Sequence, residues 1–211
     1  MPTLGSTWLR VPLDQYEGHM TAPGVDQLGA LSALFAKALR HCQPASVAVL
    51  GIAGGNGLEH LDARVTTRIV GIDVNQEYLD AVRKRYAILP GLELHCVDLA
   101  NENANLEPTK LVHAALIFEH AGVDLCLDNA LAMVSPEGRF SAVLQLPGKP
   151  GHEVSPTAFA AMQHLKSEFA LIDPAWLRKT LEARNWILED QIQIPLPSEK
   201  GLWLGIFRRN L

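Results

Sequence analysis

Residues 47–59 have the sequence VAVLGIAGGNGLE, in which four apolar residues lead directly into a cluster of glycines. A short apolar run predicts a strand buried on both faces, as in a parallel sheet. Glycines after such a strand permit positive φ and let a ligand approach the bare main chain. We therefore predict a glycine turn into a helix whose N-terminus faces a ligand. A tight turn that binds nothing would have the same sequence.

Strand and helix patterns alternate along the chain on both sides of this turn. Apolar residues at spacings of three and four indicate helices, and short apolar runs indicate buried strands. The expected strands are 47–50, 68–72, 92–97, 111–118, 139–146, 186–194 and 202–208. Helices are expected from Val25 to about 41–44, after Asn75 as the capping residue, and over 123–134, 157–167 and 174–184. The alternation predicts an α/β fold with a doubly wound, mostly parallel seven-stranded sheet, an antiparallel terminal hairpin and helices on both faces.

A chain of 211 residues has the usual length of one domain. We expect a single domain over 1–211, with an N-terminal arm and helix at 1–44 and the sheet core at 45–211. Prolines and glycines are frequent in residues 1–22, which predicts an irregular arm with at most one short turn. This arm is expected to cover part of the core.

The charge balance of 18 Lys+Arg against 23 Asp+Glu argues against a surface built to bind phosphate backbones. We expect a small-molecule partner and no nucleic acid. No signal-peptide pattern and no run of about 18 apolar residues is present, which predicts a soluble, cytoplasmic protein without a membrane partner. Cys42, Cys96 and Cys126 form no CxxC pair, so we expect reduced core thiols and no metal site. Either a monomer or a homodimer is compatible with the sequence.

Asp73 follows the second expected strand, sixteen positions after Gly57. An acid at this place typically binds ribose hydroxyls, although it could also cap the next helix, for which Asn75 is better suited. A glycine turn with a strand-end acid favours an adenosine-containing ligand. NAD is disfavoured because His60 is too large for the last position of a dinucleotide fingerprint that starts at Gly55. A triphosphate is disfavoured because Gly57 is not followed by Lys and Ser or Thr.

The motif pattern resembles the class I S-adenosylmethionine-dependent methyltransferases from about Ser46 to the terminal hairpin. Residues 55–57 match the family's GxG core, and Asp73 matches its ribose-binding acid. Residues 97–99 look like the segment whose acid meets the adenine amino group. The fourth motif resembles residues 116–120, and the turn into the fifth strand resembles residues 131–140.

The resemblance implies a Rossmann-like fold, S-adenosyl-L-methionine as the cofactor, and methyl transfer to a small-molecule acceptor. It assigns cofactor binding to Gly51, Ala53, Gly55, Asn56, Gly57, Asp73, Val74, Asp98 and Leu99. Two positions depart from the family pattern, because Gly51 stands in place of the usual acid and Ala53 in place of the first glycine. An alanine can replace that glycine where φ is negative, which is the conformation expected for Ala53. The alternative is a cofactor-binding or scaffold protein of the same fold without catalysis.

Methyl transfer of this kind depends mainly on holding the nucleophile in line with the methyl group. Where a proton must leave, the candidates that could accept it are Glu119 and His120 after the fourth strand and Tyr16 and His19 in the arm. Glu119 and His120 could instead cap a helix, and the two arm residues could serve packing alone. Gln145 and His152 are expected to shape the substrate pocket, and residues 148–151 are flexible enough to form a lid.

Overall fold

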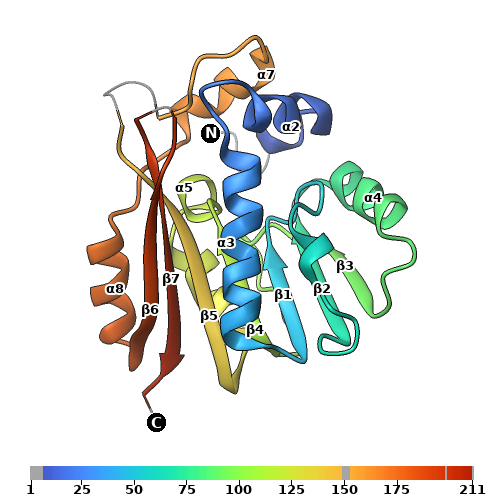
Figure 1. Ribbon diagram of the computed structural model, residues 1–211, viewed down its shortest axis with the longest axis vertical. Coiled ribbons are helices and arrows are strands. Elements are labelled where there is room, and N and C mark those ends of the chain that lie inside the picture. The colour runs from blue at the N-terminus through green and yellow to red at the C-terminus, as the bar shows by residue number, and fades with distance from the viewer. Residues whose placement is uncertain (1–6, 149–152, 198, 211) are drawn as a thin grey trace.

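The computed structural model describes residues 7–148, 153–197 and 199–210, and its centre is a seven-stranded sheet in the order β3-β2-β1-β4-β5-β7-β6 (Figure 1). The strands are β1 Ser46–Leu50, β2 Arg68–Asp73, β3 Leu92–Cys96, β4 Thr109–Ala115, β5 Val134–Leu146, β6 Trp186–Pro195 and β7 Gly201–Arg209. Strands β1 to β5 run parallel, and β7 pairs antiparallel with both β5 and β6. The predicted doubly wound sheet with a terminal hairpin is confirmed.

Helices cover both faces of the sheet, as predicted. They are α2 Leu13–Thr21, α3 Gln27–Cys42, α4 Gln76–Arg85, α5 Phe118–Ala121, α6 Asp124–Ala132, α7 Ala160–Gln163 and α8 Pro174–Glu182, with short 3-10 turns at Leu58–His60 and His164–Ser167. In β1, Val47 and Val49 pack with α3 and α4, whereas Ala48 and Leu50 pack with α6 and α8. This alternation puts one apolar core on each side of a sheet that is buried on both faces.

The arm is more regular than predicted, because α2 forms a nine-residue helix within it. Pro12 and Gly18 had indicated irregular structure. Pro12 is the residue just before the helix, where its missing N–H leaves no helical hydrogen bond unmade. Gly18 lies inside α2 with its Cα against the ring of Phe159, where a Cβ would come within 2.4 Å of ring carbons. Both residues therefore suit a packed helix, and α2 lies against α7 at one end of the sheet (Figure 1).

The predicted α-helix after the glycine turn is wrong. β1 is followed by the single 3-10 turn Leu58–His60 and then by a loop that leads to β2. The residues after Leu58 carry too few apolar positions to form a helix stripe. This face of the sheet is already covered by α3, whose Phe35 belongs to the same apolar cluster as Leu58.

Smaller corrections concern strand ends and cysteines. β4 ends at Ala115 rather than at Phe118, because Leu116 adopts a φ of 54° and turns the chain. β5 begins at Val134, five residues earlier than expected. Cys126 is buried as expected, whereas Cys42 is half-buried and Cys96 is exposed. None of the helices in the described ranges has the length and apolar character that a membrane crossing needs.

Gly57 gives a test of why the turn contains glycine. Its φ is 92°, and an added Cβ would lie 2.7 Å from Cδ1 of Phe35, a fully buried ring stacked on His113. Gly24 has a similar φ of 83° but nothing within 4 Å of its Cβ position. Each alanine substitution should lose about 1–2 kcal/mol through the left-handed backbone. Gly57→Ala should lose about 1–3 kcal/mol more through overpacking, as measured by urea unfolding. Equal losses would show that Phe35 yields without penalty.

Candidate cofactor and substrate site

A cavity of about 1040 Å³, including its open mouth, lies at the carboxyl ends of the parallel strands. The strand order reverses between β1 and β4, which are neighbours in the sheet although β2 and β3 lie between them in sequence. Open α/β sheets bind their ligands at such a point. The arm supplies Trp8 and Tyr16 to the cavity, and the turn before β7 supplies Lys200. The cavity is therefore built from segments that lie far apart in the sequence.

Six of the nine expected cofactor-binding residues line this cavity: Gly51, Ala53, Asp73, Val74, Asp98 and Leu99. The remaining three, Gly55, Asn56 and Gly57, are not part of its lining. A Cβ at Gly55 would lie 2.6 Å from the ring of Tyr86, and the Asn56 side chain donates to the carbonyl oxygen of Leu28. Gly55 and Gly57 therefore pack against side chains of the protein itself, whereas Gly51 and Ala53, at the start of the turn, line the cavity.

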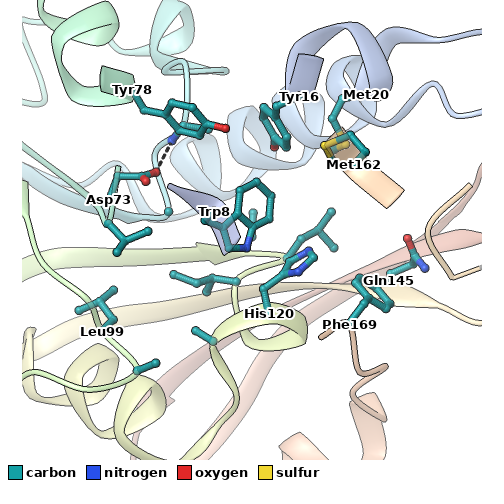
Figure 2. Close-up of a pocket in the computed structure, with 18 of the residues that line it drawn as sticks. Trp8, Tyr16, Met20, Asp73, Tyr78, Leu99, His120, Gln145, Met162 and Phe169 are labelled. Carbon is teal, nitrogen blue, oxygen red and sulfur yellow. Dashed lines mark hydrogen bonds between the residues drawn. The ribbon is translucent and has the colours of Figure 1, made fainter. Parts of the chain in front are cut away.

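Asp73 joins the ends of the first two strands. Its Oδ2 accepts a hydrogen bond of 2.9 Å from the main-chain N–H of Ala53 (Figure 2). Its Oδ1 accepts one of 3.0 Å from the main-chain N–H of Asn75. The helix cap is Asn75, whose side chain accepts from the N–H of Glu77. Each Asp73 oxygen keeps a further lone pair, and burial raises the pKa of this carboxyl to about 6.

Ala53 corrects the expectation of a negative φ at this position, because its φ is 46°. Gly51 also has a positive φ, at 65°. A left-handed alanine is uncommon and is held here by the hydrogen bond from its N–H to Asp73. The turn is therefore fixed by the strand-end acid.

Asp98 follows β3 at the same end of the cavity. Its Oδ1 accepts from the N–H of Ala100 and its Oδ2 from the Asn101 side chain, at 3.1 and 2.9 Å. Leu99 and Ile72 are buried and also line the cavity. Two oriented carboxylates next to apolar walls suit a nucleoside, which presents hydroxyl and amino donors around a flat ring.

An aromatic wall crosses the middle of the cavity, as Figure 2 shows. The ring of His120 meets the edges of Trp8 and Phe169, with centroids 4.9 and 5.1 Å apart. Its Nδ1 is buried without a hydrogen-bond partner among the described residues. Burial lowers the pKa of His120 to about 4, so the ring is neutral near pH 7. Burial and the Asp73 charge raise the pKa of Tyr16, which keeps its hydroxyl protonated.

Glu119, the second candidate after β4, does not line the cavity. Its side chain is almost fully buried, and Oε1 accepts a hydrogen bond of 2.8 Å from the N–H of Gln145. Its Oε2 has no partner among the described residues, and burial raises the pKa of the carboxyl to about 7. Glu119 therefore holds the end of β5 in place rather than facing a ligand.

The far end of the cavity carries polar groups from four segments. His19 lines it, with Nδ1 at 2.9 Å from the hydroxyl oxygen of Thr157. Gln27 Nε2 donates to Oε1 of Gln145, and Gln145 Nε2 donates to the carbonyl oxygen of Glu153. Gln145 thus lines the cavity as expected. His152 and residues 149–151 of the expected lid lie outside the described residues.

Several residues that line the cavity were not predicted from the sequence. Met20, Gln27, Tyr78, Met162, Phe169 and Lys200 line the cavity but were not among the expected site residues. Tyr78 is on the cavity side of α4, and its hydroxyl donates to the carbonyl oxygen of Val11. Phe169 and Lys200 lie in connecting segments that have no periodic pattern. Their only signal was an apolar or basic residue in a loop, which is too common to indicate a site.

Glu119 gives a prediction about stability and pH. Its pKa is about 7 when folded and about 4.3 in an exposed glutamate. The folded chain therefore holds the proton more tightly, and Glu119 stabilises it less as pH rises from about 4.5 to 7. Glu119→Gln removes this titration. As pH rises through that window, the free energy of unfolding of the variant should therefore increase relative to that of the wild type by about 1.4 kcal/mol per pH unit. Urea unfolding at pH 5, 6 and 7 measures this gain.

The matched control is Glu107→Gln, because Glu107 is exposed. Its difference from the wild type should stay constant across the same pH range. Parallel profiles for Glu119→Gln and the wild type would contradict the burial of an ionisable Glu119.

Comparison with known proteins supports the architecture. No family model and no curated protein sequence matches the chain. Among solved structures, magnesium protoporphyrin IX methyltransferase ChlM from Synechocystis PCC 6803 with bound S-adenosylhomocysteine has a TM-score of 0.71 at 10% identity, covering 98% of both chains. N-methyltransferase NodS from Bradyrhizobium japonicum WM9 with S-adenosylhomocysteine has a TM-score of 0.63 at 17% identity, covering 96% of this chain and 90% of NodS. The [4+2]-cyclase SpnF has a TM-score of 0.61 at 12% identity, covering 79% of this chain and 74% of SpnF. The chain has the fold of the class I S-adenosylmethionine-dependent methyltransferases.

Proposed function

We propose that this protein is an S-adenosylmethionine-dependent methyltransferase that acts on a small-molecule acceptor. The observation that carries the proposal is Asp73, a strand-end carboxylate oriented by two main-chain N–H groups and lining the cavity of this fold. When bound, the cofactor supplies an electrophilic methyl group on a sulfonium sulfur. Asp73 would accept hydrogen bonds from its ribose hydroxyls, and Asp98 from its adenine amino group.

The chain's own contribution to transfer is mainly to position the acceptor. His120 has a pKa near 4 and is a weak base, Tyr16 stays protonated, and Glu119 does not face the cavity. The aromatic wall limits the directions from which an acceptor can approach. This arrangement favours an acceptor that is nucleophilic without a strong base, with the unpaired Nδ1 of His120 able to accept a hydrogen bond from it.

The alternative is a protein of the same fold that binds the cofactor without transferring its methyl group. Gly51 in place of an acid and the low pKa of His120, which makes its ring a weak base, both favour it. Calorimetry with S-adenosylmethionine, S-adenosylhomocysteine and NAD separates the cofactor classes. Incubation with methyl-labelled S-adenosylmethionine and a low-mass metabolite extract then separates the two functions. Label in a low-mass product supports transfer, whereas tight binding without any labelled product supports the alternative.

The proposal also includes a single domain over residues 1–211, a monomer or homodimer, and a cytoplasmic location without nucleic-acid or membrane partners. The continuous seven-stranded sheet supports the single domain, and the net charge of −5 supports the expectation that nucleic acid is not a partner. Size-exclusion chromatography with light scattering tests the oligomeric state.

Cofactor affinity should depend on pH through Asp73. Ribose hydroxyls donate to the ionised carboxylate, whose pKa is about 6 in the free protein because of burial. Affinity is therefore present above this pKa and lost as pH falls through it. Between pH 7.5 and pH 5, the dissociation constant of S-adenosylhomocysteine should rise about tenfold, since about a tenth of Asp73 stays ionised at pH 5. Isothermal calorimetry at the two pH values measures this.

Asp73→Asn is the control for this prediction. The amide keeps the size of the side chain but does not titrate, so its affinity should be low at both pH values. A wild-type affinity that does not change with pH, or a variant that retains the pH dependence, would remove Asp73 from the cofactor site.

The arm should respond to the cofactor. Trp8 and Tyr16 line the cavity, and the arm is tied to α4 by the Asn75 side chain, which donates to the carbonyl oxygen of Trp8. A bound ligand would add contacts to this segment and slow its local opening. Amide exchange over residues 8–20 should therefore slow when S-adenosylhomocysteine is added, while α8 stays unchanged. Identical exchange in the arm with and without ligand would show that it does not close over the cofactor.

A further inference from the structure

Lys200 is a buried cation in the wall of the cavity. Its residue is 6% exposed and stands immediately before β7. Nζ donates hydrogen bonds of 2.9 Å to the carbonyl oxygen of Glu153 and to the hydroxyl of Ser155. Both partners are neutral oxygens, and an ammonium group has three donors. Among the described residues, these two bonds leave one N–H of the Lys200 ammonium group for a ligand.

Burial outweighs the attraction of the Glu153 carboxylate in setting the pKa of Lys200. The Glu153 carboxylate acts on it through space, and burial lowers the pKa of Lys200 to about 8. It is still mostly protonated at pH 7. A buried charge is costly unless it is paired, so an anion that entered the cavity would gain a favourable partner.

His19 adds a second donor at the same end. The hydroxyl of Thr157 accepts from the N–H of Phe159, so its own hydrogen can go to Nδ1 of His19. The neutral tautomer then carries its hydrogen on Nε2, which makes this atom a donor. Burial and, to a smaller extent, the Lys200 charge lower the pKa of His19 to about 4, so the ring stays neutral.

The two ends of the cavity differ in charge. Gln145 Nε2 and Lys200 Nζ both donate to the carbonyl oxygen of Glu153, so these side chains lie at one end. Figure 2 shows Gln145 on the opposite side of the cavity from Asp73, with Met162 and Phe169 on the side of Gln145. The carboxylates of Asp73 and Asp98 thus line the end expected to hold the nucleoside, whereas the other end holds the Lys200 ammonium group beside Glu153, which also lines the cavity. An anionic group would be repelled by the two carboxylates at the first end and attracted by the Lys200 charge at the second.

We propose that Lys200 and His19 form a subsite for an anionic group of the methyl acceptor, a proposal that rests on the proposed methyl transfer. The acceptor is then an organic anion, with a carboxylate or a phospho group at the Lys200 end. Its apolar or aromatic body lies against Met20, Met162 and Phe169. Two other roles fit a buried lysine: a purely structural tie to residues 153–155, and binding of the cofactor's own carboxylate.

The first experiment compares matched probes on the wild-type protein, with and without saturating S-adenosylhomocysteine. The probes are 3-phenylpropionate, 2-phenylethylphosphonate and the neutral 3-phenylpropanamide, titrated by NMR chemical-shift perturbation. At least one acid should bind about tenfold more tightly than the amide when S-adenosylhomocysteine is bound, and the better acid identifies carboxylate or phospho chemistry. An amide that binds as tightly as both acids in both states would overturn the proposal.

The second experiment uses Lys200→Gln, with Lys84→Gln as the matched control because Lys84 is exposed on α4. The Lys200 variant should lose the preference for the acid and keep its affinity for S-adenosylhomocysteine within about twofold, whereas the control keeps both. A tenfold loss of S-adenosylhomocysteine affinity would assign Lys200 to the cofactor instead. A preference for the acid that survives, with only a lower melting temperature, would leave it a structural tie.

Two further outcomes are distinguishable. If Lys200→Gln does not fold, Lys200→Arg must retain the acid preference, and the wild-type comparison of acid and amide still decides the proposal. If the wild type does not bind S-adenosylhomocysteine, the proposed function fails, while the comparison without cofactor still tests the anion subsite.

Discussion

The hydrogen bond from the Ala53 N–H to the Asp73 carboxylate is the interaction on which the site depends. It ties the turn after β1 to the end of β2 and holds a non-glycine residue in a left-handed conformation. Because the second oxygen accepts from Asn75, the same carboxylate also sets the start of α4. One side chain therefore orients the turn, a helix and the edge of the cavity. A ligand at this place would meet groups that are already oriented, which lowers the entropy lost on binding.

The architecture was predictable because both of its signals are local. Short apolar runs such as 47–50 and the spaced apolar residues of α3 are dictated by burial, and the Asn75 cap depends on residues two positions apart. The glycine turn was only half predictable. Its glycines were correctly associated with positive φ, but whether Gly57 faces a ligand or the ring of Phe35 depends on where α3 packs. That is a tertiary fact with no local pattern.

The residues of the site show the same difference between local signals, which can be read from the sequence, and tertiary packing, which cannot. Asp73, Val74, Asp98 and Leu99 directly follow strands, and parallel strands bring their ends together, so their place in the cavity followed from the fold. Lys200 and Phe169 come from connecting segments whose paths the strand pattern does not set. Glu119 illustrates the converse: it is one residue before His120 in a short helix, and the helix turns one side chain to the cavity and the other toward β5. Sequence position alone could not separate these two neighbours.

The place of β7 in the sheet has a consequence for biosynthesis. β7 pairs with both β5 and β6, although it follows them in the chain. While a ribosome is still producing residues 201–209, β5 has an open edge, and β6 has no partner strand to join. Open edges of this kind invite pairing between chains. Lys200 takes its position at the cavity only when β7 inserts between β5 and β6. The end of the cavity that contains Lys200 therefore forms last. A nascent chain that has already paired its parallel strands does not yet have a complete binding pocket.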